Sequence, residues 1–324
     1  MAVKLDRLPK PGETIFGGEF ASASGGKGAN QAVSAARAGG AVTFIARIGR
    51  DLFGDQAVAG FVADGINVNY LIRDQSHPSG VALIFIGRAG ENSIAVSPGS
   101  NGKLAPADLK KNRKAFDDAG VLVLQLEIPM KTVEAAAALA VGAGLRVVLN
   151  PAPAQWLPAS LLRRVSVLTP NESETELLTG VKPTDVAAVG RAAAELLSRG
   201  VQNVVITLGA RGAYVAGKDG NHVIPGYKVN AIDTTGAGDV FSGGLAEALA
   251  EGKPLVEAAR FANAAAAISV TRMGAQTSAP ARQEIEHMLA TGEVERPVLS
   301  PVPAAQRNGH PAPFPWKRTA RIEV

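Results

Sequence analysis

The sequence predicts an α/β fold of three layers, in which helices cover both faces of a mostly parallel sheet. The first observation behind this prediction is a series of short apolar runs rich in β-branched residues, a pattern typical of buried parallel strands. The second is that helical patterns lie between these runs, and such an alternation indicates βαβ units. The predicted strands are residues 42–48, 81–86, 121–125, 146–149, 165–168 and 204–207.

The helices are predicted by the spacing of their apolar residues. Residues 184–199 place Val189, Ala193 and Leu196 on one face of a helix, and Gly200 follows as a typical helix end. The same reasoning predicts helices at residues 31–38, 131–143 and 237–250.

Two β-rich segments interrupt the alternation. Residues 13–20 and 81–97 contain no helical pattern, and residues 88–92 have the composition of a hairpin turn. We predict that the two segments form a small β lid beside the α/β body. A pair of peripheral strands fits the pattern equally well.

The end of the chain changes character at about residue 292. Six prolines punctuate the segment that follows, and it has no apolar period. This composition predicts one domain over residues 1–291 and a Pro-rich, disordered tail over residues 292–324.

Composition excludes several classes of protein. Of the 324 residues, 46% are hydrophobic and 19% are charged, as in ordinary globular proteins. The absence of cysteine excludes disulfides and thiol nucleophiles, and it fits a reducing cytoplasm. The net charge of +4 comes without a dense basic run, which argues against a nucleic-acid partner. No apolar stretch is long enough to span a membrane, so a membrane is not expected as a partner.

A glycine-rich turn near the C-terminal third carries the strongest chemical signal. The chain has neither G-x-x-x-x-G-K-[ST] nor G-x-G-x-x-G, so a Walker ATPase and a Rossmann dehydrogenase are disfavoured. Residues 233–239 read DTTGAGD and open a predicted helix. Backbone N–H groups at that helix start would face an anion, and Asp239 could accept a proton from a substrate hydroxyl. A plain N-cap aspartate behind a glycine turn is the alternative.

Two further motifs could line a site. Residues 25–30 read GGKGAN, in which Lys27 and Asn30 offer polar groups suited to sugar hydroxyls, although a glycine turn capped by Asn30 is the simpler alternative. Residues 169–174 read TPNESE and follow a predicted strand, where ligands bind in open α/β sheets. Asn171 and Glu174 could hold water-bound Mg²⁺, or they could form a capping box.

Together these segments resemble the ribokinase family of sugar kinases, over about residues 9–289. The paired motifs at 25–30 and 233–239 are specific in combination, and residues 150–154 and 261–280 add to the match. The resemblance implies ATP-dependent phosphorylation of D-ribose at its 5-hydroxyl, giving ribose 5-phosphate and ADP. A related sugar or nucleoside kinase, or a catalytically impaired sugar-binding homologue, is the alternative. The intact GAGD sequence opposes the impaired homologue.

The resemblance also implies roles for individual residues. Asp239 would be the base, and the anion hole would be Gly236, Ala237 and Gly238. The sugar would be bound by Gly26, Lys27, Gly28, Asn30, Glu127 and Asp239. ATP would contact Asn171, Thr207, Leu208, Gly209, Ala210, Arg211, Gly212, Gly238 and Asn263. Glu174 would place Mg²⁺ through water. An activating K⁺ would bind, mostly through carbonyl oxygens, at Asp233, Thr235, Ser269, Arg272, Gly274 and Ser278. The lid would also make a homodimer contact.

The N-terminal region departs from the family pattern. Family members begin with a buried strand that ends in an Asn-x-Asp turn, whose aspartate binds sugar hydroxyls. This chain begins at Met1 beyond that point of the pattern, and Asp6 falls too late to replace the aspartate. The expectation is that the family's first strand is missing, and that either the true start lies upstream or the kinase is impaired.

Overall fold

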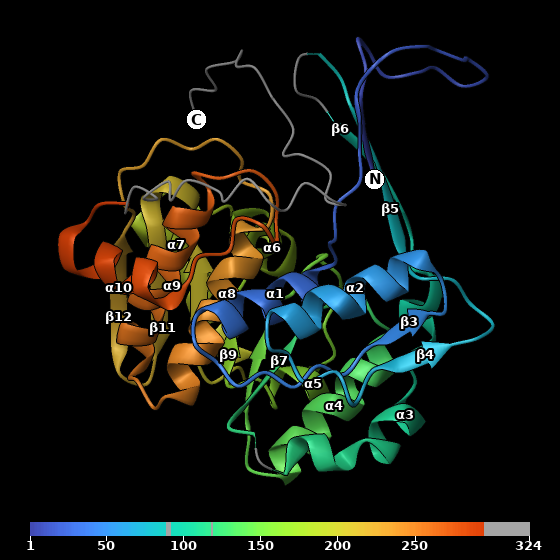
Figure 1. Ribbon diagram of the computed structural model, residues 1–324. Helices are drawn as coiled ribbons and strands as arrows, with labels where there is room; N and C mark the ends of the chain where they lie inside the picture. The colour runs from blue at the N-terminus through green and yellow to red at the C-terminus, as the bar shows by residue number, and fades with distance from the viewer. Residues whose placement is uncertain (89–91, 118, 295–324) are drawn as a thin grey trace. The chain divides into compact units, whose positions relative to one another are not determined.

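A computed structural model describes residues 1–88, 92–117 and 119–294 of the chain (Figure 1). Its main sheet has six strands in the order β12-β11-β10-β9-β8-β7. The four strands from β10 to the edge strand β7 pair in parallel, whereas β11 and β12 form an antiparallel hairpin beside β10. The bounds are β7 Val121–Leu124, β8 Arg146–Leu149, β9 Val167–Leu168, β10 Val204–Thr207, β11 Gly212–Gly217 and β12 Gly220–Pro225.

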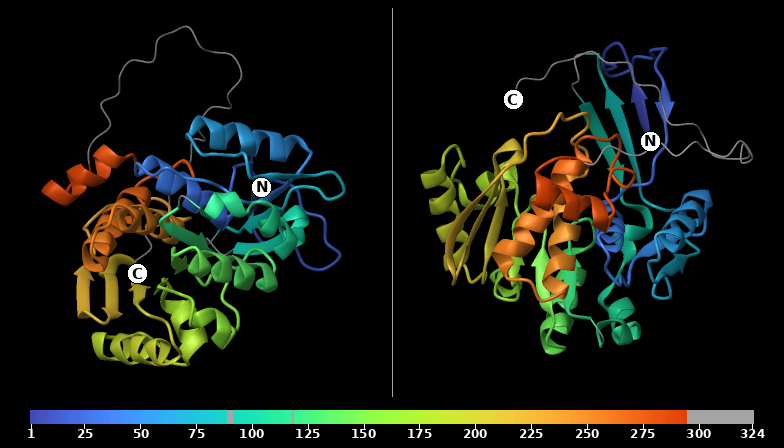
Figure 2. Two further views of the ribbon diagram at one scale, coloured as in Figure 1. Left: turned by 90° about the horizontal axis from the view of Figure 1, so that it is seen from below. Right: turned by 60° about the vertical axis from the view of Figure 1, so that its left-hand side comes forward.

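Helices cover both faces of this sheet, as the right-hand view of Figure 2 shows. Alternate side chains of a strand enter different cores, because successive residues point to opposite faces. Val148 of β8 belongs to the core that includes residues of α1, α2, α8, α9 and α10, whereas Val147 and Leu149 belong to the core that includes residues of α4, α5, α6 and α7. The bounds are α1 Lys27–Arg37, α2 Leu52–Ala63, α3 Pro106–Lys111, α4 Met130–Gly142, α5 Ala159–Leu162, α6 Glu172–Thr179, α7 Val186–Ser198, α8 Ala237–Ala250, α9 Leu255–Ser269 and α10 Arg282–Thr291. The predicted three-layer fold is therefore confirmed.

The first helix begins earlier than the sequence pattern suggests. Its N-cap is Gly26, which adopts φ +95° and ends the preceding loop, so that Lys27 already has helical geometry. The predicted start at residue 31 is therefore four residues late. The GGKGAN motif accordingly forms the start of α1 rather than a loop ahead of it.

A second sheet of four strands, in the order β2-β1-β5-β6, forms separately from the main one. We call it the lid; its strands are β1 Ala2–Lys4, β2 Phe20–Ala21, β5 Val81–Ile86 and β6 Asn92–Ser97. The segment 81–97 was predicted, but the strand expected at 13–20 is mostly wrong. Gly17 and Gly18 have φ +120° and +92°, which interrupt an extended strand, and β1 supplies the extra pairing instead.

The strand predicted at residues 42–48 is also largely wrong. Only β3 Arg47–Gly49 forms, and it pairs in parallel with β4 Ile72–Asp74 in a two-stranded sheet, while Thr43 makes an isolated bridge to Asn67. Among the described residues the six-stranded sheet ends at β7. The run at 42–46 makes isolated backbone hydrogen bonds to residues 67–72 on its other side, and without a ladder on the β7 side it forms no continuous strand.

Two expectations lie mainly outside the described residues. The hairpin turn expected at 88–92 and the tail expected at 292–324 both include segments for which the structure gives no placement, so both stay predictions. Within the described part, no helix is long and apolar enough to cross a membrane.

Candidate active site

Asp239 lies in the first turn of α8 and is only 5% exposed. Each of its carboxylate oxygens accepts one hydrogen bond from α1. Asn30 Nδ2 donates to Oδ2 at 2.8 Å, and Gln31 Nε2 donates to Oδ1 at 3.0 Å. Burial raises the pKa of Asp239, and the Asn30 hydrogen bond, the charge of Lys27 and the Gln31 hydrogen bond oppose that rise. The result is a desolvated carboxylate held at two points.

The turn before α8 depends on Gly236. This N-cap has φ +76°, and a Cβ added there would lie 2.8 Å from the Cβ of Ala275, so only glycine fits. Ala237 donates its N–H to the Thr234 carbonyl at 3.2 Å. Gly236 and Gly238 donate theirs to no acceptor within the described residues. Free N–H groups at a helix start attract an anion, and these two lie beside Asp239.

The start of α1 lies against the carboxyl end of β7. The Lys27 N–H donates to Glu127 Oε2 at 2.8 Å. A Cβ on Gly28 would lie 2.9 Å from Gln125 Oε1, and one on Gly26 would lie 3.8 Å from Glu127 Oε2. The glycines of the motif thus allow α1 to approach the residues that follow β7. The structure brings together the predicted sugar residues Gly26, Lys27, Gly28, Asn30 and Glu127 with Asp239.

Asn171 and Glu174 form the capping box that was the alternative interpretation of their spacing. Glu174 N–H donates to Asn171 Oδ1 at 2.8 Å, and Asn171 N–H donates to Glu174 Oε2 at 2.9 Å. Burial raises the pKa of Glu174; the charge of Asp239 adds to the rise, whereas the Asn171 hydrogen bond and the charge of Lys27 oppose it. Lys27, Glu174 and Asp239 therefore share one electrostatic environment.

The segment after β10 packs beside the start of α6. The Thr207 N–H donates to the Pro170 carbonyl at 3.0 Å, and Thr207 bridges to Asn171. Arg211 pairs with Glu172 and also donates to the Thr184 carbonyl, so its side chain is held on the protein surface. Asn263 lies apart from this cluster on α9, where it donates to the Pro225 carbonyl at 3.0 Å. The structure brings the predicted ATP residues of 171 and 207–212 together, and Asn263 flanks the end of β12.

The predicted K⁺ residues lie on two segments, 233–235 and the stretch from the end of α9 to residue 278, and Asp233 joins these segments. Its Oδ1 accepts the Thr235 N–H at 2.9 Å and its Oδ2 accepts the Gly274 N–H at 2.8 Å. The Arg272 guanidinium, which pairs with Glu284, is cationic and has no acceptor atom, so Arg272 could offer a cation only its backbone carbonyl. A set of carbonyl oxygens with one carboxylate is suited to a hard cation. In the described part of the chain no three His, Cys, Asp or Glu residues cluster around a metal site.

The comparisons with known proteins agree with this geometry. A family model described as pfkB family carbohydrate kinase matches residues 2–282. The chain belongs to the pfkB family of carbohydrate kinases. The family resemblance predicted from the motifs is thereby confirmed.

Individual pfkB-family relatives support the assignment over nearly their whole length. The chain is 45% identical over 282 residues to a ribokinase of Haemophilus influenzae, a match that covers 87% of this chain and 92% of the relative. A solved ribokinase of Thermotoga maritima superimposes with a TM-score of 0.82 at 39% identity, covering 89% of this chain and 95% of that one. An Arabidopsis thaliana ribokinase complexed with ribose and ATP gives 0.83 at 31% identity, covering 89% and 94%.

Of three amide side chains in this pfkB-family site, Gln31 and Asn150 were missed from the sequence, whereas Gln125 was expected to line a cleft only because it ends a predicted strand. Gln31 contacts Asp239 directly, and Gln125 and Asn150 contact Gln31. Gln31 directly follows GGKGAN, and Gln125 precedes the predicted Glu127 by two residues. No local signal shows that these amides contact one another or Asp239, because the hydrogen-bonded partners lie 94 to 208 residues apart.

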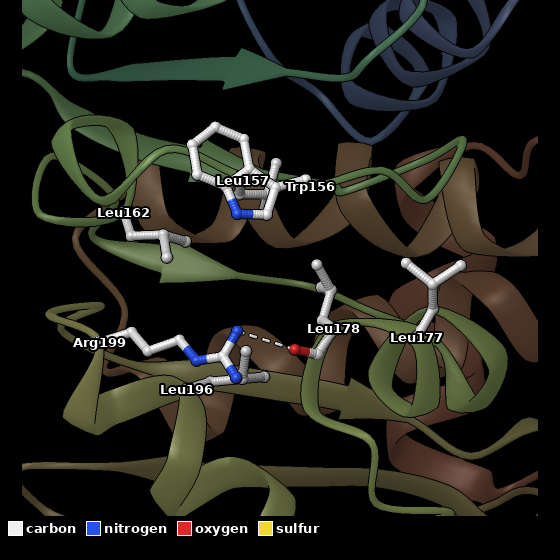
Figure 3. Close-up of a pocket in the computed structure, with 7 residues that line it drawn as sticks. All are labelled: Trp156, Leu157, Leu162, Leu177, Leu178, Leu196 and Arg199. Carbon is white, nitrogen blue, oxygen red and sulfur yellow. Dashed lines mark hydrogen bonds between the residues drawn. The ribbon is translucent and has the colours of Figure 1, made fainter.

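A cavity of about 140 Å³ lies elsewhere, among α5, α6 and α7. Figure 3 shows that its walls are apolar apart from Arg199, which donates to the Leu178 carbonyl at 2.8 Å. None of the predicted site residues lines it. It offers no side chain suited to act as an acid, base or nucleophile.

Proposed function

We propose that this chain transfers the γ-phosphoryl group of ATP to the 5-hydroxyl of D-ribose, giving ribose 5-phosphate and ADP. The observation that carries the proposal is the buried Asp239 carboxylate at the start of α8, which accepts hydrogen bonds from the Asn30 and Gln31 amides of α1. The similarity to an Arabidopsis ribokinase complexed with ribose and ATP supports the choice of both substrates.

The side chains suit a reaction that consists mainly of positioning and charge stabilisation. Asp239 accepts the proton of the attacking hydroxyl, whose oxygen bonds to the γ-phosphorus as the bond from that phosphorus to the bridging oxygen breaks. The N–H groups of Gly236 and Gly238 face the charge that develops on the phosphoryl oxygens. Lys27 adds positive charge near Asp239 and Glu174. The raised pKa of Asp239 makes it a stronger proton acceptor than an exposed aspartate.

Glu174 is the residue proposed to place Mg²⁺. When bound, the ion would neutralise charge on the ATP phosphates. Glu174 fits an indirect role through water, because its Oε2 accepts the Asn171 N–H and a second oxygen is left to face solvent molecules. Asn171, residues 207–212 and Asn263 are proposed to contact ATP, with Asn263 doing so from beside the end of β12.

A panel of substrates tests the proposal against a related kinase for another sugar or a nucleoside. With ATP and Mg²⁺ present, we expect ADP release to be fastest with ribose among ribose, 2-deoxyribose, fructose and adenosine. Faster turnover of another substrate would contradict the assignment of ribose as substrate, but the assignment of the chain as a kinase would stand. Absence of turnover with every member would favour the impaired sugar-binding homologue.

Activation by K⁺ is expected if Asp233 and the neighbouring carbonyls form the cation site. The site would link residues 233–235 to 269–278, and residue 235 leads directly into Gly236, so an occupied site would order the turn before α8. We expect several-fold higher kcat in KCl than in NaCl at equal ionic strength. Equal rates in the two salts would remove the cation site from the proposal.

The lid is proposed to form a homodimer contact. Phe20, Leu83, Ile94 and Val96 are large apolar side chains of lid strands and are between 44% and 65% exposed, and such patches mark interaction surfaces. Light scattering on the intact chain, compared with a variant carrying Ile94→Lys, distinguishes a dimer from a monomer.

We also propose that the reaction takes place in the cytoplasm, where ATP is available and where a chain without cysteine needs no oxidising environment.

A further inference from the structure

Gln31 stands out because every hydrogen of its amide is used inside the protein. It is 2% exposed and lies in the first half of α1. Its Nε2 donates to Asp239 Oδ1 at 3.0 Å and to Asn150 Oδ1 at 3.2 Å, and its Oε1 accepts from Gln125 Nε2 at 2.5 Å. Its neighbour Asn30 differs, because the buried Asn30 Oδ1 has no hydrogen-bond partner within the described residues. Asn30 thus retains an acceptor for a ligand, whereas Gln31 has no donor left to offer one.

The orientation of the Gln31 amide is fixed from the ends of three neighbouring strands. Asn150, after β8, donates its Nδ2 to the Thr169 carbonyl at 3.0 Å, so its Oδ1 must face Gln31. Gln125, after β7, presents an NH₂ group that needs an acceptor. A reversed Gln31 amide would place its oxygen against two acceptors and its NH₂ against a donor. Only the observed orientation satisfies the network.

We propose that Gln31 is a positioning residue, which holds one oxygen of the Asp239 carboxylate so that the carboxylate meets the sugar hydroxyl in a fixed orientation. This inference rests on the proposed function, since it assigns Asp239 as the proton acceptor. Gln125 and Asn150 act one step further away, because they touch Gln31 and not Asp239. The network therefore transmits the arrangement of three strand ends to the reacting group.

The same contact affects the ionisation of Asp239. The charged groups that act on this region are Lys27 of α1 and Glu174 of α6, and both remain when Gln31 is replaced. The Gln31 hydrogen bond is one of the causes that oppose the burial-driven rise in the pKa of Asp239. Its loss raises that pKa further. Since the deprotonated form accepts the proton, the acidic limb of the kcat profile must then move to higher pH.

The test compares Gln31→Met with Gln125→Met, the double variant and Gln56→Met, a substitution of the same chemistry on the exposed face of α2. For Gln31→Met we expect kcat to fall about tenfold or more, with sugar KM changed less than about threefold, and an acidic limb at higher pH. Gln125→Met should show a smaller fall in kcat. The double variant should be no slower than Gln31→Met, because Gln125 acts only through Gln31. Gln56→Met should match the wild type.

Three results would overturn the inference: an unchanged kcat, a sugar KM that rises in proportion to the loss of kcat/KM, or additive effects in the double variant. If another sugar is the better substrate, the same profiles are measured with that sugar. If no sugar is turned over, the proposed function fails, and ¹³C NMR of aspartate-labelled protein still decides this inference. The Asp239 signal, assigned with Asp239→Asn, should titrate at higher pH in Gln31→Met, and an unmoved titration would refute the contact's role.

Discussion

Replacing Asp239 with asparagine is expected to lower kcat about 10³-fold, because general base catalysis contributes about 10² to 10⁴ in rate. The shape of the side chain is kept, so the Asn30 and Gln31 amides stay nearby, but the group can no longer accept a proton. ATP affinity should change little, since the proposed ATP contacts lie mainly at Asn171 and residues 207–212. Steady-state kinetics with ribose and calorimetric titration of ATP measure the two effects.

Glu247→Gln is the matched control for Asp239→Asn. Glu247 lies two turns further along α8, is 9% exposed and also has a pKa raised by burial. It faces Gly40 and Arg282 rather than the site. We expect kcat close to the wild-type value for this variant. If Asp239→Asn keeps more than a tenth of the activity while Glu247→Gln behaves normally, another group must accept the proton.

Gly243→Ala is expected to disturb both stability and catalysis, because α1 and α8 cross at this residue. An added Cβ would lie 2.5 Å from the Gln31 carbonyl and 2.7 Å from the Ser34 Cβ. Overpacking of this kind costs about 1–3 kcal/mol, only partly offset by the better helix propensity of alanine. Moving α1 away from α8 also separates Asn30 and Gln31 from Asp239. We expect a lower free energy of unfolding and about a tenfold lower kcat/KM for ribose.

The adjacent Gly244 provides the control for this crossing. A Cβ there would meet its nearest atoms, in Ala262 and Ala265, at 3.5 Å, which is ordinary contact. Gly244→Ala should therefore be neutral or gain up to about 1 kcal/mol from helix propensity. Urea unfolding and ribose kinetics of both variants measure the contrast. Equal behaviour of the two variants would mean that the α1–α8 distance does not control the site.

The sequence was most informative where a local pattern suffices to specify the structure. β8 and β10 were predicted to the residue, because their apolar runs are buried on both faces and bounded by polar turns. The run at 42–48 is similarly apolar, but a strand also needs a neighbouring strand with which to pair. Only Arg47–Gly49 pairs in a ladder, with β4. The β11–β12 hairpin was not predicted, since its pairing to β10 is antiparallel in a sheet expected to be mostly parallel.

In the candidate site, too, the sequence predicts the features that depend on a local pattern and misses those that depend on packing. The position of Asp239 at a helix start could be predicted, because the glycines around it are typical of such a turn. Its partner Gln31 could not, because its role arises only when α1 packs against α8 and the ends of β7 and β8. At Asn171 and Glu174 the spacing alone permitted both a cap and a metal role, and the structure shows the cap.

The burial of α8 has a consequence for motion. Eleven consecutive residues of α8, from Asp239 to Leu249, are buried, whereas residues 93–97 of β6 in the lid are exposed throughout. Local unfolding free energies are highest where backbone is enclosed and lowest where it is solvated. Amide hydrogens of α8 should accordingly exchange only when the whole domain opens, and those of the lid edge should exchange far sooner. The proposed proton acceptor is thus carried on a helix that we expect to exchange slowly, while the lid can fluctuate without displacing it.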